Sequence, residues 1–145
     1  MIQRVQSLFY LLATLSAGAL FFLPMVTSDK AAGLFMEDKV FNVFDHIGLT
    51  IVAVLATLLP FVAIFLYKNR STQIKVGASS LVFPLLLFIA AILILTGMGN
   101  EAELSANFFP NIGIFLLVAA LIFSILGNRF VKKDDELVKS SDRLR

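Results

Sequence analysis

Four long apolar stretches without charge dominate this chain. They cover residues 8–26, 47–67, 76–98 and 108–126, and none of them contains Asp, Glu, Lys, Arg or His. An α-helix needs about 20 mostly apolar residues to cross the hydrocarbon core of a bilayer. Because a backbone in lipid must pair its polar groups internally, and because the stretches lack the alternation of a membrane β-strand, helices are expected. The pattern predicts an all-α membrane protein, a bundle of four transmembrane helices.

The composition also points to lipid as the solvent. Of the 145 residues, 59% are hydrophobic, compared with roughly 45–50% in average globular chains. A small domain has little interior in which to bury this excess. The first stretch follows a positive start at Arg4, as a signal peptide does, but its apolar run is longer than a signal core and no A-x-A-like site follows it. We therefore expect all four stretches to be retained as membrane spans.

The charges between the spans predict which side of the membrane each segment occupies. Ten of the twelve basic residues lie in the N-terminal stub, in the loop 68–75 and in the tail after residue 127. The other two segments, 27–46 and 99–107, carry six acidic residues and only Lys30 and Lys39. Cytoplasmic segments of membrane proteins carry the excess of Lys and Arg, so an N-in/C-in topology is predicted. The residues expected to set this topology are Arg4, Lys68, Arg70, Lys75, Arg129, Lys132 and Lys133.

Residues 1–127 are expected to form the transmembrane domain, and residues 128–145 a charged cytoplasmic tail that is helical. In the tail, Phe130, Leu137 and Leu144 are spaced by seven residues, with Val131 and Val138 beside them. This spacing gives an apolar stripe on a helix. The stripe can dock on lipid, on the loop 68–75 or on a partner protein. Because the tail mixes acids with bases, a purely electrostatic lipid anchor is disfavoured, and docking on self or partner is preferred.

The segment between the first two spans, residues 27–46, is predicted to form a small outer cap. Its apolar residues flank Glu37-Asp38-Lys39, a plausible turn. Since Val and Phe favour strands, a hairpin or an irregular cap is expected. The cap is either a lid over the bundle, which we favour, or a docking surface for a partner. The candidate docking residues are Phe35, Phe41 and Phe44 in the cap, and Phe130, Val131, Leu137, Val138 and Leu144 in the tail.

Inside the bundle, Pro60 and Pro84 are predicted to kink the second and third spans, because a proline within a helix removes one hydrogen bond. Transporters that are coupled to ions usually need an acid or base near mid-membrane, and these spans have none. The chain also lacks Cys, and the pair Asp45-His46 has no nucleophile or further metal ligand beside it in the sequence. No catalytic residue, cofactor or metal site is therefore expected, and topology explains the basic charge better than nucleic-acid binding does.

Three segments carry a resemblance to a known family. Residues 1–7 are MIQRVQS, residues 64–70 are IFLYKNR with Gln73-Ile74-Lys75 after them, and residues 132–145 are KKDDELVKSSDRLR. Together they resemble an uncharacterised family of four-span inner-membrane proteins of Bacteroidota, defined by a domain of unknown function. The resemblance covers essentially the whole chain, and the closing segment is its most specific part. It implies a bacterial inner membrane and supplies no activity, cofactor or catalytic residue.

The sequence leaves more than one class of function open. The first is a non-enzymatic accessory or scaffold subunit of an inner-membrane protein complex, which fits the small size, the apolar outer loop and the striped tail. The alternative is a small transporter, channel or lipid-handling protein, which would need Pro60 and Pro84 to shape a cavity. The expected partners are the lipid bilayer and another membrane-protein complex. A homo-oligomer is also compatible with the small residues in the spans.

Overall fold

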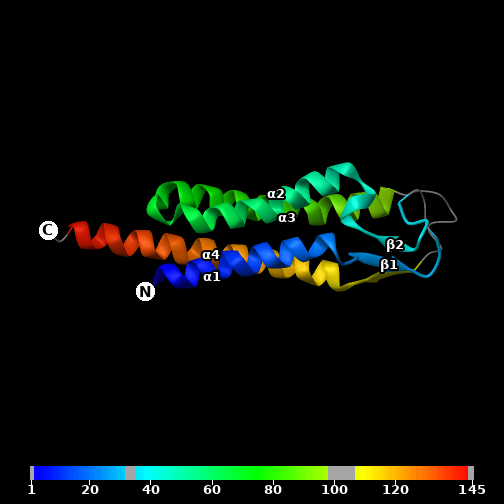
Figure 1. Ribbon diagram of the computed structural model, residues 1–145, viewed down its shortest axis with the longest axis horizontal. Coiled ribbons are helices and arrows are strands. Elements are labelled where there is room, and N and C mark those ends of the chain that lie inside the picture. Colours follow the sequence, from blue (N-terminus) through cyan, green and yellow to red (C-terminus); the bar gives the residue numbers. More distant parts are fainter. Residues whose placement is uncertain (1, 32–34, 98–106, 144–145) are drawn as a thin grey trace.

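The computed structural model describes residues 2–31, 35–97 and 107–143. Over these residues the chain forms four α-helices, α1 (Ile2–Gly18), α2 (Ile47–Phe65), α3 (Arg70–Gly97) and α4 (Ile112–Arg143). All four run along one long axis, and both termini lie at the same end (Figure 1). α1 packs against α2 and α4, and α3 also packs against α2 and α4, so α1 and α3 face each other diagonally across the bundle.

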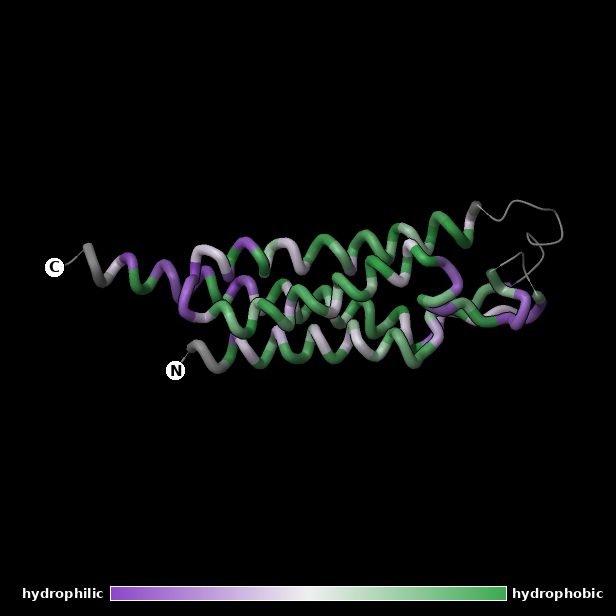
Figure 2. Tube along the Cα trace, turned by 45° about the horizontal axis from the view of Figure 1, so that its top comes forward, coloured by the Kyte–Doolittle hydropathy of each residue, from purple (hydrophilic) through white to green (hydrophobic). Residues whose placement is uncertain are grey.

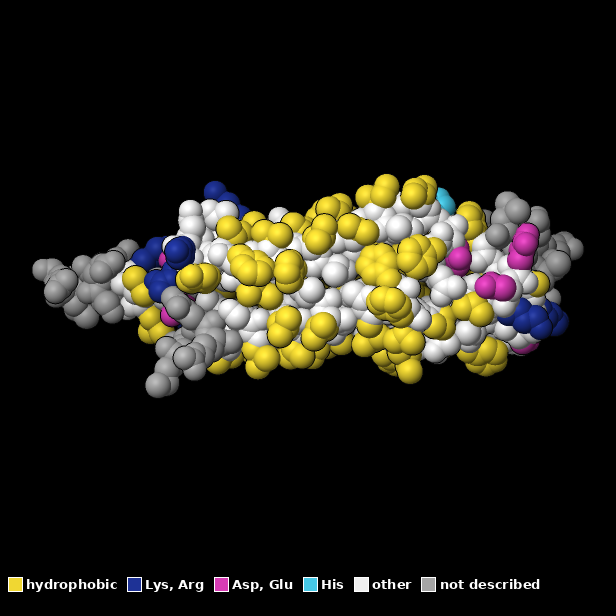
Figure 3. Space-filling model, in the orientation of Figure 1, with side chains coloured by type: hydrophobic (Ala, Val, Ile, Leu, Met, Phe, Trp, Pro, Cys, Tyr) yellow, Lys and Arg dark blue, Asp and Glu magenta, His cyan; other side chains and the backbone are white. Residues whose placement is uncertain are grey.

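Three helical segments are long and apolar enough to cross a membrane, by length and composition: Ile47–Lys68, Arg70–Thr96 and Ile112–Ser140. The apolar segment in the first helix, Val5–Phe21, is shorter. The middle of the bundle is hydrophobic and its two ends are hydrophilic (Figure 2). On the face shown in Figure 3, Lys and Arg gather near the termini, and acidic side chains gather at the opposite end together with further Lys or Arg. This is the surface expected of a helical membrane protein.

The first predicted span, residues 8–26, extends too far. α1 ends at Gly18, a 3-10 helix η1 (Ala19–Phe21) follows, and Val26 already belongs to strand β1 (Val26–Ser28). The physical reason is Pro24, which has no N–H and disfavours the helical conformation in the residue before it. Beyond Pro24, the Met25 N–H donates to the Phe41 carbonyl at 2.9 Å. The chain therefore leaves the helix about five residues earlier than its hydropathy indicates.

The fourth predicted span, residues 108–126, begins too early. Residues Phe108–Pro110 form strand β3, and α4 begins at Ile112. Pro110 is tolerated there because β3 is an edge strand, where a missing N–H leaves no ladder bond unpaired. At the other end, α4 continues without a break from the apolar run through the tail to Arg143. The backbone thus shows no boundary at residue 127.

The loop expected between the second and third spans is mostly helical. α2 passes into a 3-10 helix η3 (Leu66–Lys68), and α3 begins at Arg70, well before the predicted start at residue 76. Asn69 joins the two, because its side-chain carbonyl accepts the Thr72 N–H at 3.3 Å and its backbone carbonyl accepts the Gln73 N–H at 2.9 Å. α3 ends at Gly97, and residue 98, the last of the predicted span, lies outside the described residues.

A three-stranded antiparallel sheet closes the end of the bundle opposite the termini (Figure 1). Its order is β2-β1-β3, with β2 at Val40–Phe41. Within residues 36–39 the chain reverses direction, because the Lys39 N–H donates to the Met36 carbonyl at 3.1 Å and Lys39 has a φ of 66°. This turn contains the segment Glu37-Asp38-Lys39. β3 follows α3 in the chain and pairs with β1, so that Thr27 lies opposite Phe109.

Buried apolar side chains hold the sheet to the helices. Met25 and Phe41 from the sheet lie in one fully buried cluster with Leu49 of α2, Leu87 of α3 and Leu117 of α4. In the middle of the bundle, the buried layer consists of small residues from three helices, Ala17, Ala56 and Ala120. Small side chains let the helix backbones approach closely. Pro60 and Pro84 are both buried within α2 and α3.

Candidate functional site

The strongest candidate site is a hollow on the cytoplasm-facing end predicted from the sequence, where α4 leaves the bundle. It has a volume of about 560 Å³ and is lined by residues of α4 alone: Leu126, Arg129, Phe130, Lys132, Lys133 and Glu136. We call these six residues the basic hollow. Four of them, Arg129, Phe130, Lys132 and Lys133, are residues that the sequence singled out for topology or docking.

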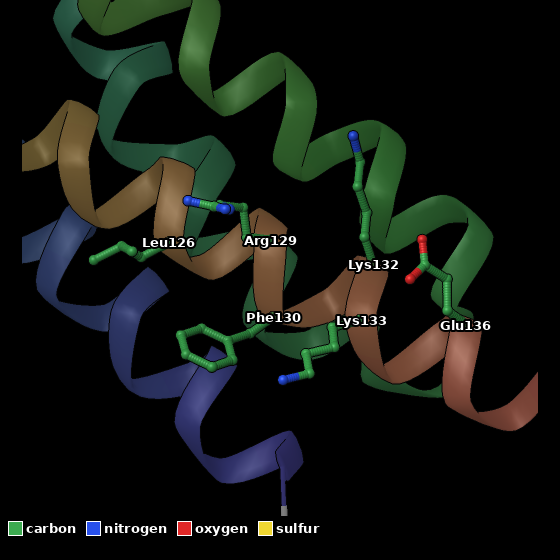
Figure 4. A pocket seen from close by; sticks show the side chains of 6 residues that line it. All are labelled: Leu126, Arg129, Phe130, Lys132, Lys133 and Glu136. Carbon is green, nitrogen blue, oxygen red and sulfur yellow. The ribbon is translucent and has the colours of Figure 1, made fainter.

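The helical repeat of α4 brings these residues together. Leu126, Phe130 and Lys133 are three or four residues apart, so they lie on one face over two turns. The Phe130 ring stacks on Phe9 of α1, with centroids 5.3 Å apart and planes 6° apart. Lys132 and Lys133 point to opposite sides of α4 in Figure 4. The lining therefore combines apolar side chains, of which Phe130 packs on α1, with cationic side chains on both sides of α4.

Two acidic residues of the tail form ion pairs with bases outside the basic hollow. Asp134 pairs with Arg70 at the start of α3, at 3.1 Å, and Asp135 pairs with Lys139 at 2.6 Å, one turn along α4. Among the described residues that line the basic hollow, Glu136 is the only acid beside three cations. Asp134 and Asp135 therefore neutralise Arg70 and Lys139 rather than the cations of the basic hollow, and the hollow is positively charged.

The other topology-setting residues occupy the same end of the bundle. Lys68 and Arg70 line a second hollow of about 550 Å³ together with Tyr67 and Asn69, and Lys75 is exposed on α3. Arg4 lies in the first turns of α1. The structure brings the basic residues from the three segments to one end, as Figure 3 shows for the face it displays.

The candidate docking residues separate into buried and exposed ones. Phe41 and Val131 are buried, at 0% and 1% exposure, and each packs inside the chain, so neither can contact a partner. Phe35 is half-buried with its ring 5.7 Å from that of His46. Phe44, Leu137 and Val138 are exposed at 61%, 47% and 38%. Leu144 lies outside the described residues. Among the described candidates, these three residues are exposed, and Phe35 and Phe130 are half-buried.

A buried polar layer was missed by the sequence analysis. Gln6 and Tyr10 of α1, Gln73 of α3 and Asn128 of α4 are all buried. The Gln73 side-chain amide donates to the Ala63 carbonyl of α2 at 3.0 Å. One side-chain oxygen of each of the four residues has no hydrogen-bond partner among the described residues. A count of charges overlooks this layer because all four side chains are neutral, although Gln6 and Tyr10 are four residues apart and share a helix face.

Tyr10 lies between two glycines of neighbouring helices. A Cβ on Gly127 of α4 would be 3.0 Å from the Tyr10 ring, and a Cβ on Gly77 of α3 would be 2.1 Å from its hydroxyl oxygen. The same Cβ on Gly77 would be 3.2 Å from Oδ1 of Asn128. Tyr10 thus spans the diagonal of the bundle, and only glycine leaves room for it at both positions.

Asp45 and His46 have structural roles at the start of α2. The Asp45 carboxylate accepts the Asn42 N–H at 2.5 Å, and Nδ1 of His46 accepts the Gly48 N–H at 3.0 Å. Burial raises the pKa of Asp45 above its ordinary value, and the hydrogen bond from Asn42 opposes this shift. Within residues 2–31, 35–97 and 107–143 there is no group of three or more His, Cys, Asp or Glu side chains that could hold a metal ion.

Comparison with known proteins places this fold in a family. No curated protein and no solved structure matches the chain. A family model described as a domain of unknown function, DUF4293, matches residues 2–144. Because the match covers almost the whole length, the helices, the sheet and the basic hollow all lie within the unit that defines the family. The chain therefore belongs to the DUF4293 family.

Proposed function

We propose that this protein is a four-span protein of a bacterial inner membrane that serves as a non-enzymatic accessory or scaffold subunit of a membrane-protein complex. The apolar segment Val5–Phe21 has 17 residues, which is the lower end of the range of about 17–25 for a membrane span. It packs beside α2 and α4, which are long enough to cross. These contacts support α1 as the fourth span.

The segregation of charge supports both termini in the cytoplasm. The basic ends of α1, α3 and α4 lie together with the termini, and the sheet with Asp29, Asp38 and Asp45 lies at the other end. The positive-inside rule then assigns the end with the termini to the cytoplasm and the sheet to the outer side, where it serves as the cap over the bundle. The resemblance to a Bacteroidota inner-membrane family, carried by residues 1–7, 64–75 and 132–145, supports a bacterial inner membrane as the location.

The observation that carries the accessory role is the length of α4. Its 32 residues span roughly 48 Å at 1.5 Å per residue, whereas the hydrocarbon core is about 30 Å thick. The C-terminal part of α4 therefore projects past the ends of its neighbours, as Figure 1 shows. The ion pair between Asp135 and Lys139 supports the helix there, within the projecting part.

Apolar side chains on this projecting helix suit a protein partner. Leu137 and Val138 are adjacent in the chain, and their exposed fractions are 47% and 38%. In water such a pair costs free energy, and a groove on another protein that covers it recovers roughly 1.5–3 kcal/mol for each side chain fully buried. We therefore assign the docking contact to Leu137 and Val138, with Phe44 as a separate exposed residue at the opposite end.

Native purification tests the proposal. The protein, tagged at its N-terminus and extracted from its own cells in a mild detergent, should co-purify with a larger complex at fixed stoichiometry. The double change Leu137→Ser with Val138→Ser should release it, because the apolar contact is removed while the charge is unchanged. Leu137→Met with Val138→Ile, which keeps both side chains apolar and the charge unchanged, is the control and should leave the complex intact. A solitary monomer after gentle extraction of the unchanged protein would contradict the accessory role.

A small transporter, channel or lipid-handling protein is the alternative, and the buried polar layer favours it. The side-chain oxygens of Gln6, Tyr10, Gln73 and Asn128 come from three helices and have no hydrogen-bond partner among the described residues, so they could bind a polar solute near the basic end of the bundle. Reconstitution into vesicles distinguishes the two roles. A flux of small polar solutes that disappears with Asn128→Leu would support transport, whereas vesicles as tight as protein-free ones would remove this alternative.

A further inference from the structure

We propose that the basic hollow binds the phosphate of an anionic phospholipid in the cytoplasmic leaflet. This inference rests on the proposed topology, with the basic end of the bundle in the cytoplasm, but it does not depend on the accessory role. It rests on three features of the described residues: the level of the hollow along the helix axis, the excess of positive charge on its lining, and the apolar strip on α4 that continues from it.

The depth of the hollow matches the border between hydrocarbon and headgroups. From Ile112 to Asn128, α4 carries no charged residue, and Arg129 is the first. On the neighbouring helix α3, Lys75 is the last charged residue before its apolar run. In a bundle that spans the membrane with its basic end in the cytoplasm, Arg129 and Lys133 stand at the level of the lipid phosphates.

The charges around the hollow select an anion. Arg129, Lys132 and Lys133 lie on its lining, with Lys132 and Lys133 on opposite sides of α4 (Figure 4), and the only acid there, among the residues that the structure describes, is Glu136. Asp134 and Asp135 are held by Arg70 and Lys139. A guanidinium can bind two phosphate oxygens at once, and a lysine ammonium adds a compact positive charge. Basic pockets beside transmembrane helices on the cytoplasmic side bind anionic headgroups in this way.

The apolar strip beside the hollow favours a lipid over a soluble phosphate. Leu126 and Phe130 form the membrane side of the lining. Ile122 and Ile125 continue the same face toward mid-membrane and are exposed at 50% and 45%. The ring of Phe9 stacks on Phe130 and holds its side chain in place, so little conformational entropy of Phe130 is lost when a ligand binds. An acyl chain can lie along the strip while its phosphate occupies the hollow.

Lipid titration of the purified full-length protein tests the site. In a mild non-ionic detergent, the binding of phosphatidylglycerol and of phosphatidylcholine is measured by native mass spectrometry, which counts bound lipids. Removing two basic residues should weaken phosphatidylglycerol binding roughly 30-fold, since each contributes about fivefold near an anionic headgroup. We therefore expect this loss for Lys132→Gln with Lys133→Gln. The matched control, Lys68→Gln with Lys75→Gln, removes the same charge from the same end and should weaken binding much less, because neither residue lines the basic hollow.

A variant that strengthens binding keeps the test informative if the double variant folds poorly. Glu136→Gln removes the acid from the lining, so it should tighten phosphatidylglycerol binding about fivefold. Equal losses in the two double variants would show that net charge rather than the hollow attracts the lipid, and would overturn the proposal. Equal affinity for the two lipids would overturn it as well. Competition by glycerol 3-phosphate at the concentration at which the lipid binds would instead assign the hollow to a soluble phosphate.

Discussion

Replacing Gly77 by alanine tests the packing around Tyr10. The added Cβ would lie 2.1 Å from the Tyr10 hydroxyl oxygen, far inside van der Waals contact. The side chain has little room to move away, because it is fully buried, at 0% exposure, and packs against α4 at Gly127. One of the two helices must therefore shift. Overpacking of this kind typically costs about 1–3 kcal/mol.

The net effect is smaller than this cost, because alanine favours a helix more than glycine does, by about 1 kcal/mol. We expect Gly77→Ala to lower the free energy of unfolding by roughly 0–2 kcal/mol, and by about 1–3 kcal/mol relative to a glycine-to-alanine change that causes no clash. On the scale for domains of this size, the fall in Tm is up to roughly 6 °C. The assay is thermal unfolding in a mild detergent, followed by circular dichroism.

Two further variants decide whether the reasoning is correct. Gly18→Ala is the matched control, because its Cβ would meet the Thr57 methyl at an ordinary 3.6 Å, and it should leave Tm unchanged or slightly raised. Adding Tyr10→Phe to Gly77→Ala removes the clashing oxygen, so it should recover at least half of the loss. The reasoning is refuted if Gly77→Ala is as stable as Gly18→Ala, or if the phenylalanine recovers nothing.

Three other predictions concern polar contacts. Asn107 donates to the Asp29 carboxylate from its side chain and its backbone, and these bonds lower the pKa of Asp29. The stability from this contact is present above the unfolded pKa of Asp29, near 3.9, and is lost as the pH falls through the lower folded pKa. Asn107→Ala should raise the pKa of Asp29, as measured by carboxyl NMR titration in micelles. Asp134→Ala should cost about 1 kcal/mol or less, and Arg70→Ala should add no further loss in a double-mutant cycle of thermal unfolding. Asn128→Leu should be neutral or stabilising in the same assay, because its buried oxygen has no partner among the described residues; a loss above about 1 kcal/mol would show that the oxygen is hydrogen-bonded in the membrane.

The apolar runs determined most of the helical structure, because lipid leaves a backbone few alternatives to a helix. Where the runs misled, the cause was local and visible. Pro24 and Pro110 both lie inside apolar segments that were assigned to spans, and each marks a place where the helix is absent. Hydropathy does not distinguish apolar residues in a helix from apolar residues in a buried sheet, so Val26 and Phe108 were placed in the wrong kind of element.

The sequence contained all the residues of the candidate site, but the distribution of charge in that site came from contacts. In the sequence, the tail mixes six basic residues with four acidic ones, so its net charge is small. In the structure, Asp134 reaches Arg70 on another helix, and the basic hollow keeps its positive charge. Long-range pairing of this kind depends on which helices become neighbours, and the spacing of residues within one helix does not record it.

The sequence by itself determined that this chain has long apolar helices able to cross a membrane, roughly where their central parts lie and which end of them is basic, because hydropathy and charge act residue by residue. Only the tertiary structure decided that β1 pairs with β3 from beyond the third helix, and that Tyr10 packs across the bundle between Gly77 and Gly127. Both arrangements join segments more than 60 residues apart in the chain. Their energy depends on close packing and on hydrogen bonds between neighbours that exist only after the helices have assembled.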